Sequence, residues 1–358
     1  MRMEQNVVLA PYTTLGIGGP ARYFCTVESE ADLCAALAFA RAEKLQHFVL
    51  GGGSNLLLSD AGFEGLVLRI AIQGMVQHGS RTVAAAGVSW DSLVDFAIAK
   101  GLAGIECLAG IPGTVGGTPV QNVGAYGQEV AETITRVRAC DLVRGEFVDL
   151  SHAQCGFAYR TSLFNVAPPT GARGRYLVTE VEFQLRPQGE PTLKYAELAR
   201  RFAGEPKPSL QKVAEAVREI RAAKGMVTAA PGADGKYPAE RDPDTCSAGS
   251  FFRNPVVDAS VLQRVVEELH VSPESVPHWP MADGGIKLPA AWLIERAGFA
   301  KGFQMGAAAI SSRHTLALTN CGGATAAEIV ALRDRIASVV QRRFGVKLEQ
   351  EPVSIGIC

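Results

Sequence analysis

The sequence predicts an α+β protein, because segments with helical and with strand periodicity follow one another without regular β-α-β alternation. Several short apolar or alternating runs in the first 222 residues indicate strands. A stretch rich in Pro, Gly, Asp and Ala at 224–245 then breaks the pattern and is typical of a long loop or a domain boundary. We therefore expect a larger N-terminal part and a smaller C-terminal part.

The elements of the N-terminal part are marked by helix start and stop signals. Ser29 precedes an apolar-periodic segment at 30–44 and is expected to cap a helix there. Ser89 is expected to cap a second helix that ends at Gly101, and Ser209 to open a third. The expected strands are His47–Leu50, Leu66–Ile70, Thr82–Ala86 and Tyr176–Leu185.

The C-terminal part is expected to contain both helices and strands. The pattern predicts helices near 259–269 and 289–297, with strand-like segments near 306–319. Thr325 and Glu328 have the spacing of a capping box, which predicts a helix over 325–343.

Composition excludes several classes of protein. The 35 basic and 36 acidic residues leave a net charge of −1, which argues against binding to nucleic acid or to a membrane surface. Apolar runs are too short to span a membrane, and the N-terminus has no signal-peptide pattern. The eight cysteines form no CxxC pair, so we expect reduced thiols and a cytoplasmic protein. The six histidines show no metal-ligand spacing, and we expect no metal site.

Two glycine-dense segments are the strongest functional signal. They read LGGGSNLLL (50–58) and GIPGTVGGTPVQNVGAYG (110–127). Glycine lets backbone approach a ligand closely, and successive N–H groups in such loops can hold an anion. The alternative is a pair of tight turns, but turns rarely need so many amide and hydroxyl side chains beside the glycines. We therefore favour a large phosphate-bearing cofactor held between two backbone cradles.

The segment AGSFFRNP (248–255) leaves two interpretations open. Ser250 has no histidine nearby to act as its base and is a poor nucleophile, but its hydroxyl can donate a proton to a developing carbanion. The simpler alternative, which the residues alone favour, is a core strand in which Ser250 is incidental.

The chain resembles the UDP-N-acetylenolpyruvoylglucosamine reductases, the MurB family of flavoenzymes in bacterial cell-wall synthesis. The resemblance runs nearly end to end, and its motifs occur in the family's order. They are LGGGSNLLL (50–58), GIPGTVGGTPVQNVGAYG (110–127), FAYRTSLF (157–164), AGSFFRNP (248–255), IKLPAAWLIERAGFAKG (286–302) and LEQEPVSIG (348–356).

The resemblance implies a two-lobed FAD-binding domain of the vanillyl-alcohol-oxidase (PCMH) type and a smaller α+β substrate-binding domain. The PCMH-type region would span about 17–188. Lobe 1 would comprise residues 1–70 with 346–358 returning to it, lobe 2 residues 71–222, and the substrate-binding domain residues 223–345.

The resemblance also assigns the two glycine loops to FAD. The first would hold the pyrophosphate, and the second would line the rest of the flavin. FAD is expected to be noncovalent, because the first loop contains no histidine for covalent attachment. The expected cofactor-binding residues are Gly51, Gly52, Gly53, Ser54, Asn55, Gly113, Gly117, Gln121 and Asn122.

The implied reaction is the NADPH-dependent reduction of the enolpyruvyl ether of UDP-N-acetylglucosamine to UDP-N-acetylmuramate. Three residues match the family's catalytic positions: Arg160, Ser250 and Glu351. Arg160 would stabilise the charge that develops on the substrate carboxylate, and Glu351 would polarise or hydrogen-bond the same group. Ser250 would protonate the carbon next to the carboxylate.

Four residues are expected at the substrate by the same resemblance: Tyr126, Tyr195, Lys224 and Asn254. Tyr195 matches the substrate-covering tyrosine of one class of the family. Lys224 would meet the diphosphate, with Lys236 as its rival because the linker is long. Many members have Glu-Val-Arg where this chain has Glu351-Pro352-Val353, so any function of that arginine is in doubt.

Two other functions stay open at this stage. A different FAD-dependent oxidase of the same fold would lack the Arg–Ser–Glu set and would consume oxygen without NADPH. A noncatalytic nucleotide-sugar binding protein would purify colourless. We expect a monomer whose partners are the enolpyruvyl substrate and NADPH.

Overall fold

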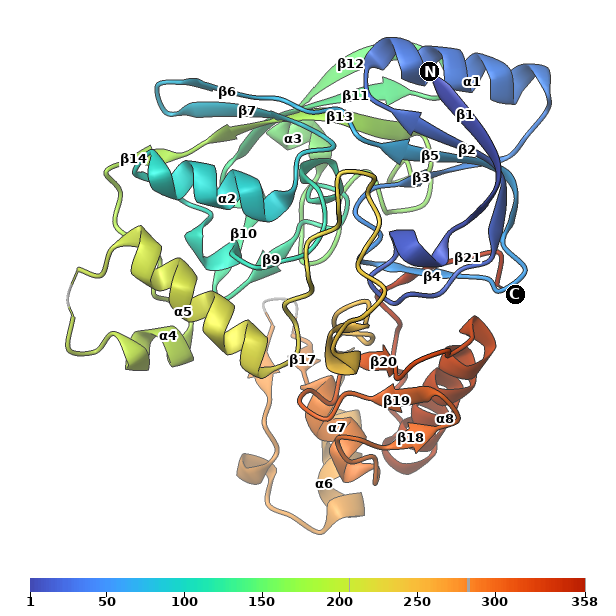
Figure 1. Cartoon of the computed structure of the whole chain (residues 1–358). Coiled ribbons are helices and arrows are strands. Elements are labelled where there is room, and N and C mark those ends of the chain that lie inside the picture. The colour runs from blue at the N-terminus through green and yellow to red at the C-terminus, as the bar shows by residue number, and fades with distance from the viewer. Residues whose placement is uncertain (206, 282–283, 358) are drawn as a thin grey trace. The chain divides into compact units, whose positions relative to one another are not determined.

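The computed structural model describes residues 1–205, 207–281 and 284–357 (Figure 1). The chain divides into two compact units. The first unit contains Met1–Val7, Ala21–Gly53 and Glu64–Ala223, and the second contains Val8–Pro20, Ser54–Phe63 and Lys224–Cys358. The first glycine loop therefore lies where the chain passes from one unit to the other. The expected division of the N-terminal part into two lobes stays a prediction.

A four-stranded sheet with strand order β1-β2-β5-β3 begins the first unit. Helix α1 (Glu30–Ala42) follows β2, and the Ser29 hydroxyl accepts a hydrogen bond from the Asp32 N–H (3.1 Å), as the predicted N-cap requires. The buried stripe of α1 includes Leu33 and Leu37. The strands of this sheet are β1 (Arg2–Val8), β2 (Pro20–Val27), β3 (His47–Leu50) and β5 (Phe63–Ile70), and β3 runs parallel to β5.

A five-stranded antiparallel sheet follows, with strand order β12-β11-β13-β7-β6. Its central strand β13 alternates buried and partly exposed residues, as the sequence pattern predicted. The strands are β6 (Met75–His78), β7 (Arg81–Ala85), β11 (Ile134–Asp141), β12 (Glu146–Ser151) and β13 (Tyr176–Gln184). The short helix α3 (His152–Cys155) follows β12 and has a capping box at Ser151.

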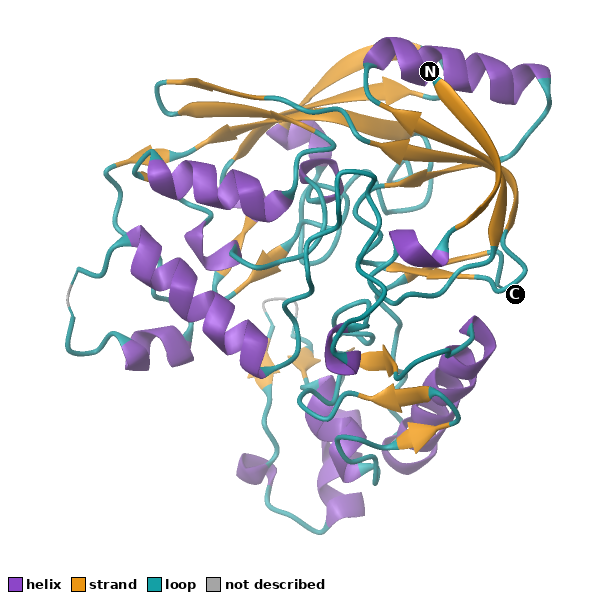
Figure 2. Cartoon of the chain, in the orientation of Figure 1, coloured by secondary structure: helices purple, strands orange, loops and turns teal. Residues whose placement is uncertain are grey.

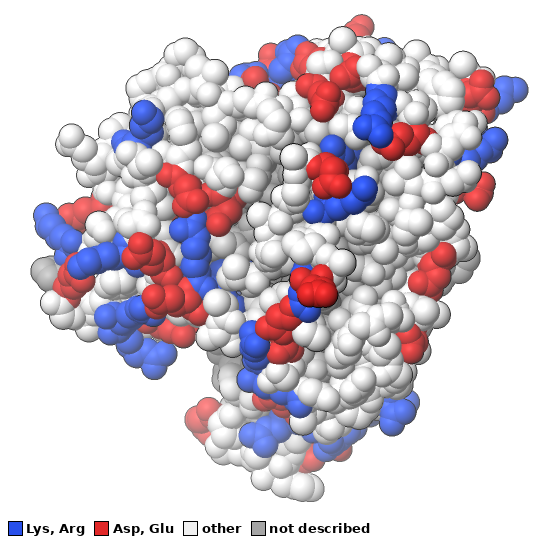
Figure 3. Space-filling model, in the orientation of Figure 1, with Lys and Arg blue, Asp and Glu red and all other residues white. Residues whose placement is uncertain are grey.

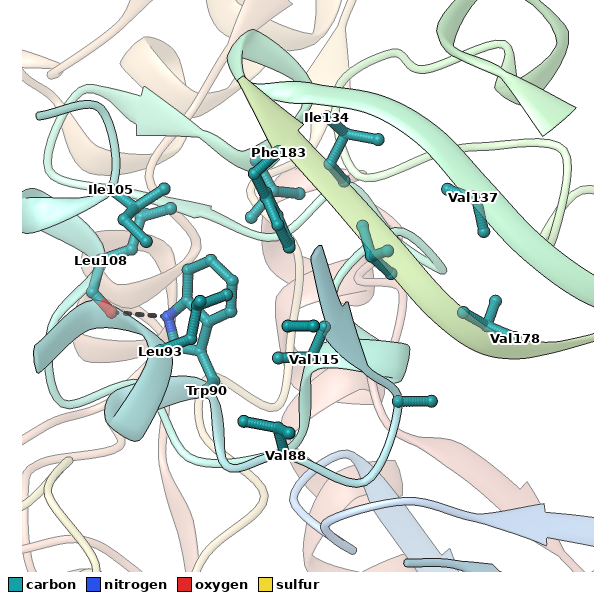
Figure 4. Packing of buried hydrophobic residues seen from close by; sticks show 14 of the residues in the cluster. Val88, Trp90, Leu93, Ile105, Leu108, Val115, Ile134, Val137, Val178 and Phe183 are labelled. Atoms are coloured by element: carbon teal, nitrogen blue, oxygen red, sulfur yellow. Dashed lines mark hydrogen bonds between the residues drawn. The ribbon is translucent and has the colours of Figure 1, made fainter. Parts of the chain in front are cut away.

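Helix α2 (Trp90–Ala99) supplies the core beneath this sheet (Figure 4). The Trp90 indole is fully buried, and its Nε1–H donates to the Leu108 carbonyl oxygen (2.9 Å). Its ring lies 6.0 Å from that of Phe183 on β13. The buried indole thus has its one donor satisfied. Ser89 precedes α2 as expected, but it makes no side-chain cap hydrogen bond to the described residues, so the predicted cap there was wrong.

Shorter elements complete the first unit. The predicted third helix is α5 (Leu210–Ala223), whose buried stripe includes Val213, Val217 and Ile220. The other elements are β8 (Leu102–Ala103), η2 (Glu106–Leu108), η3 (Val115–Gly117), β9 (Gly124–Ala125), β10 (Gln128–Glu129), η4 (Val130–Glu132), β14 (Arg186–Pro187) and α4 (Ala196–Arg201).

The second unit has its own hydrophobic core, built around helix α8 (Ala326–Phe344). The Thr325 and Glu328 capping box is present as predicted, and Gly345 ends the helix in a left-handed conformation. Helices α6 (Ala259–Leu269) and α7 (Ala290–Arg296) confirm the other two predicted helices.

The segment expected to be strand-like near 306–319 contains two short strands of a three-stranded sheet, β18-β19-β20, and a loop between β19 and β20. A parallel pair, β4 and β21, joins the segment after the first glycine loop to the C-terminal end of the chain. The strands of this unit are β4 (Leu56–Leu58), β15 (Val256–Val257), β16 (Trp279–Pro280), β17 (Ile286–Lys287), β18 (Gln304–Met305), β19 (Ala308–Ile310), β20 (Leu318–Asn320) and β21 (Val353–Ile355). Its 3-10 turns are η1 (Ala10–Tyr12), η5 (Pro243–Thr245) and η6 (Pro273–Ser275).

The predicted long loop is confirmed. Residues 224–242 contain no helix or strand, and the yellow-gold stretch of Figure 1 is drawn as loop in Figure 2. This loop is nevertheless anchored, because the N–H of the buried Tyr237 donates to the Pro11 carbonyl (2.8 Å) and Arg241 donates to the Thr14 carbonyl (2.8 Å). Among the described residues, none of the helices is long and apolar enough to cross a membrane.

Candidate active site

The two glycine loops meet in the first unit. A Cβ atom added to Gly52 would lie 2.5 Å from the Gly113 Cα, and one added to Gly51 would lie 3.1 Å from the Thr114 Oγ1. Glycine is required at position 52 because a side chain there would overlap the backbone of the other loop. The loops, which are about 60 residues apart in sequence, therefore form one backbone surface, as a cofactor held by both would need.

The second loop is fixed by main-chain hydrogen bonds. The Trp90 N–H donates to the Gly113 carbonyl (3.1 Å), and the Val115 N–H donates to the Val88 carbonyl (2.9 Å). Gly117 differs from its neighbours, because an added Cβ there would meet no described atom within 4 Å. Gly117 therefore faces open space, where backbone can approach a ligand.

The side chain of Asn122 holds neighbouring segments together, in addition to its expected contact with the cofactor. Its side chain is buried, and its amide donates to Glu129 (2.7 Å) and to the Ala158 carbonyl (3.1 Å). Its Oδ1 accepts from the Ala131 N–H (3.1 Å). These bonds tie the second glycine loop to the segment that carries Arg160. Direct contact of Asn122 or of Gln121 with the cofactor stays a prediction.

Arg160 lies in a tight turn of the first unit. Ala158 and Thr161 exchange two main-chain hydrogen bonds (3.0 Å each) around it, and the Asn165 amide donates to its carbonyl (3.0 Å). Its φ is +54°, and the site candidates Asn122 and Tyr126 also have positive φ. Such backbone is costly for residues other than glycine and persists only where neighbouring bonds hold it, as at many functional sites.

Ser250 and Glu351 lie on two paired segments of the second unit. The Glu351 N–H donates to the Phe251 carbonyl (2.8 Å), and the Arg253 N–H donates to the Glu349 carbonyl (3.0 Å). Phe251 is fully buried, so the core interpretation of AGSFFRNP is right for the aromatic side chain, while Ser250 itself remains partly exposed. The pairing places two of the three expected catalytic residues on adjacent segments that are about 100 positions apart in sequence.

Asn55, at the end of the first glycine loop, lies against the same glutamate. Its side-chain amide donates to the Glu351 carbonyl (3.5 Å), and its own carbonyl accepts from the Val353 N–H (2.9 Å). The parallel pairing of β4 with β21 continues this contact. An expected cofactor residue and an expected catalytic residue are thus held together within the second unit.

Tyr126 and Tyr195 form an aromatic pair in the first unit. Their ring centroids are 5.1 Å apart at an interplanar angle of 83°, the edge-to-face geometry that aromatic rings favour. Burial raises the pKa of Tyr126, and the nearby charge of Arg221 opposes that rise. Arg221 was not among the residues predicted from the sequence. Its only sequence signal is its place on a helix three residues before Lys224.

A buried carboxylate joins the two segments that carry these tyrosines. Glu106 Oε1 accepts from the Gln128 amide (2.8 Å) and from the Thr192 N–H (2.8 Å). Gln128 lies two residues after Tyr126, and Thr192 lies three residues before Tyr195. Glu106 is fully buried, and these hydrogen bonds replace the ones that its carboxylate would make to water in the unfolded chain.

The remaining substrate candidates lie in the second unit. Lys236 is on the long loop, where its Nζ is 3.4 Å from Asp234 Oδ2 and 5.7 Å from the centre of the Tyr12 ring. Lys224 directly follows α5. Asn254 Oδ1 accepts from the Ala290 N–H (2.9 Å), so Asn254 also satisfies the first amide of α7.

Comparison with known proteins decides the family. Residues 21–151 match the family model described as FAD binding domain, and residues 242–355 match the C-terminal domain of UDP-N-acetylenolpyruvoylglucosamine reductase. The chain is 45% identical to the UDP-N-acetylenolpyruvoylglucosamine reductase of Thermobifida fusca, over 99% of this chain and 98% of that protein. The chain belongs to the UDP-N-acetylenolpyruvoylglucosamine reductase family.

Other family members agree with this assignment. The UDP-N-acetylenolpyruvoylglucosamine reductase of Mycobacterium tuberculosis is 43% identical over 99% of this chain and 95% of its own length. The crystal structure of the enzyme from Thermus caldophilus matches with a TM-score of 0.65 and 28% identity, over 99% of both chains. These likenesses confirm the α+β class and the FAD-binding domain followed by a distinct C-terminal domain.

Proposed function

We propose that this chain catalyses the NADPH-dependent reduction of the enolpyruvyl ether of UDP-N-acetylglucosamine, which yields UDP-N-acetylmuramate for peptidoglycan. The observation that carries the proposal is the pairing of the Ser250 and Glu351 segments beside Asn55 of the first glycine loop. That arrangement supports a site in which Ser250 would donate a proton and Glu351 would supply a carboxylate near Asn55. The full-length similarity to reductases of that name supports the same activity.

The residues present fit FAD. The two glycine loops approach so closely that a side chain at Gly52 would overlap the backbone of Gly113, whereas Gly117 faces open space. Backbone N–H groups of such loops suit a pyrophosphate. When bound, FAD would supply hydride transfer between NADPH and the substrate. Gly51–Asn55 would hold the pyrophosphate, and Gly113–Asn122 would line the rest of the cofactor.

Arg160 would stabilise the negative charge of the reaction. Addition of hydride to the terminal methylene carbon of the enolpyruvyl group leaves an enolate whose charge extends onto the carboxylate. A guanidinium stays charged at all working pH values and can bind a carboxylate through two parallel bonds. The turn around Ala158 and Thr161 holds the Arg160 backbone before substrate arrives, so little reorganisation is needed.

Ser250 would complete the reaction as the proton donor. Its hydroxyl proton would go to the carbon next to the carboxylate, which converts the enolate into the lactyl ether. Glu351 would polarise or hydrogen-bond the same carboxylate. The main-chain bond between Glu351 and Phe251 supports a fixed spacing of these two groups.

The substrate-binding residues in this proposal are Tyr126, Tyr195, Lys224 and Asn254. We place Lys224 at the diphosphate, as the family resemblance implies; Lys236, whose Nζ is 3.4 Å from Asp234 Oδ2, is its rival. Tyr195 is a partly exposed residue on a loop, and it can cover bound substrate from there.

The visible spectrum of the purified protein tests the proposal directly. We expect a flavin spectrum that NADPH bleaches under anaerobic conditions and that the enolpyruvyl substrate restores. Reoxidation by oxygen alone, with no response to the substrate, would favour another FAD-dependent oxidase. A colourless protein that takes up no FAD would favour a nucleotide-sugar binding protein instead.

We further infer a cytoplasmic monomer that binds neither nucleic acid nor membranes. The net charge is −1, and acidic and basic side chains are interspersed on the face shown in Figure 3. Light scattering coupled to size-exclusion chromatography would test the oligomeric state.

A further inference from the structure

Two segments of the first unit that carry substrate candidates meet directly. Tyr126 and Gly127 form the two-residue turn of the β9–β10 hairpin, and both have positive φ (+48° and +82°), as in hairpin turns of type I′. A Cβ added to Gly127 would lie 3.0 Å from the Lys194 Cβ and 3.3 Å from the Tyr195 N. Glycine at this position therefore lets the backbone of the second segment approach the turn, where the two tyrosine rings pack.

Thr192, three residues before Tyr195, is bonded through its N–H, its hydroxyl oxygen and its carbonyl. The N–H donates to Glu106 Oε1 (2.8 Å), and the hydroxyl oxygen accepts from the Gln128 amide (3.1 Å). The carbonyl accepts from the Cys107 thiol (3.1 Å). Burial raises the pKa of this thiol, so it stays protonated and can donate. All three bonds tie Thr192 to η2 and β10.

Glu106 and Gln128 form the buried centre of this hydrogen-bond network. Glu106 accepts from the Gln128 amide through Oε1 (2.8 Å) and from the Gly104 N–H through Oε2 (2.7 Å). Gln128 Oε1 in turn accepts from the Cys107 N–H (2.8 Å). The two residues are 0% and 1% exposed. Buried polar groups with several partners are held firmly, because a hydrogen bond left unmade there is costly. The network is therefore a rigid support for the segment that it bonds.

We propose that Glu106 and Gln128 are positioning residues for substrate binding. Acting through Thr192, they hold the Tyr195 ring where it packs against the hairpin turn. The inference rests on the proposed function, which supplies the substrate that the two tyrosines meet. Both positioning residues are buried, so neither would touch that substrate. Only two residues separate Thr192 from Tyr195, and α4 begins directly after Tyr195. Fixing Thr192 thus leaves Tyr195 little freedom and reduces the ordering that substrate binding requires.

Substrate kinetics of three variants test the role in the holoenzyme. Thr192→Val removes the hydroxyl at nearly constant shape, Gln128→Met removes the amide, and Glu106→Asp keeps the charge but withdraws the carboxylate by one bond length. We expect each to raise the KM for the enolpyruvyl substrate about two- to tenfold, because ordering of the freed segment then opposes binding, while kcat changes less. The variants are compared at equal bound flavin, measured by its absorbance. An unchanged KM in all three would overturn the proposal.

A double variant distinguishes positioning from general damage. If Thr192 acts through Tyr195, Thr192→Val should add nothing to the KM of Tyr195→Ala. Effects that multiply would mean that Thr192 acts elsewhere, and the proposal would be wrong. The matched control is Thr135→Val on β11 of the same unit. It also removes a hydroxyl that is bonded to a buried network's kind of partner, the carboxylate of Glu182 (2.7 Å), and should leave KM unchanged.

A second measurement is independent of activity. Hydrogen–deuterium exchange followed by mass spectrometry reports how firmly the amides of residues 190–198 are held. In the FAD-bound protein without substrate, we expect this segment to exchange faster in Thr192→Val and Gln128→Met, and to be unchanged in Thr135→Val. Unchanged exchange in all variants, or faster exchange with an unchanged KM, would overturn the proposal.

Failure of the proposed function would look different. A protein that does not reduce the enolpyruvyl substrate contradicts that function, while faster exchange in the same variants would still show that the network holds the Tyr195 segment.

Discussion

Single residues of this site serve the fold and the expected chemistry together. Asn122 holds the second glycine loop to the Arg160 segment, and Asn254 accepts from the first amide of α7. Both were expected from the family resemblance to contact a ligand, and the structure adds a packing task to each. Substitutions at such positions would lower stability and activity at once. Ser250, Lys224 and Lys236 allow sharper tests.

Ser250→Ala should separate the two halves of the reaction. Reduction of the flavin by NADPH needs no proton from Ser250 and should keep its rate. Reoxidation by the enolpyruvyl substrate should slow by about 100- to 10,000-fold, the usual contribution of a positioned general acid. Stopped-flow flavin absorbance measures each half separately.

Ser250→Cys is the matched variant, since a thiol can also donate a proton, and it should recover part of the rate. Equal slowing of both halves in Ser250→Ala would mean that Ser250 shapes the site without delivering the proton.

The two lysines can be distinguished by the same kinetics. Lys224→Ala should raise the KM for the enolpyruvyl substrate strongly, because it removes the charge expected at the diphosphate. Lys236→Ala should change KM little, because this exposed lysine pairs with Asp234 of its own loop. The reverse result would assign the diphosphate to the long loop.

At the scale of elements, a charged pair at the end of β11 is expected to contribute to acid stability. Asp141 is buried, and Arg175, just before β13, donates to its Oδ2 (2.6 Å). The hydrogen bond from Arg175 lowers the pKa of Asp141 to about 2. A carboxylate with a lowered folded pKa stabilises the fold above its unfolded pKa, and this stabilisation is lost as the pH falls toward the folded value.

We therefore expect the free energy of unfolding of the native protein to fall between about pH 4 and pH 2, partly through Asp141. Asp141→Asn should lower stability at neutral pH and flatten this dependence. Urea unfolding followed by circular dichroism at several pH values measures both effects. An unchanged pH profile in the variant would show that other carboxylates dominate acid unfolding.

At the scale of the whole molecule, the flavin is expected to be held only by the fold. Residues 51–55 of the first glycine loop contain no histidine or cysteine for a covalent bond. Acid precipitation should therefore release all flavin into the supernatant, where its absorbance can be measured. Yellow colour that remains with the precipitated protein would contradict noncovalent binding.

The sequence by itself determined the local structure and showed which residues could bind a cofactor or take part in the reaction. The helix beginnings at Ser29 and Thr325 depend on neighbouring residues, so their patterns predicted the caps that are present. Ser89 has a similar local pattern but makes no cap bond to the described residues, and the backbone of that turn pairs with residues 113–115 instead. The two glycine loops and the family motifs were likewise visible in the sequence alone.

Only the tertiary structure decided how distant segments meet. Contact between Gly52 and Gly113, and pairing of Phe251 with Glu351, join residues far apart in the chain, and no local periodicity encodes such a contact. Arg221 was not predicted from the sequence for the same reason. On a helix it looks like any surface arginine, and only the packing of α5 against the start of the second glycine loop buries it. Local patterns arise from interactions within a few residues, whereas the site depends on which buried surfaces fit together.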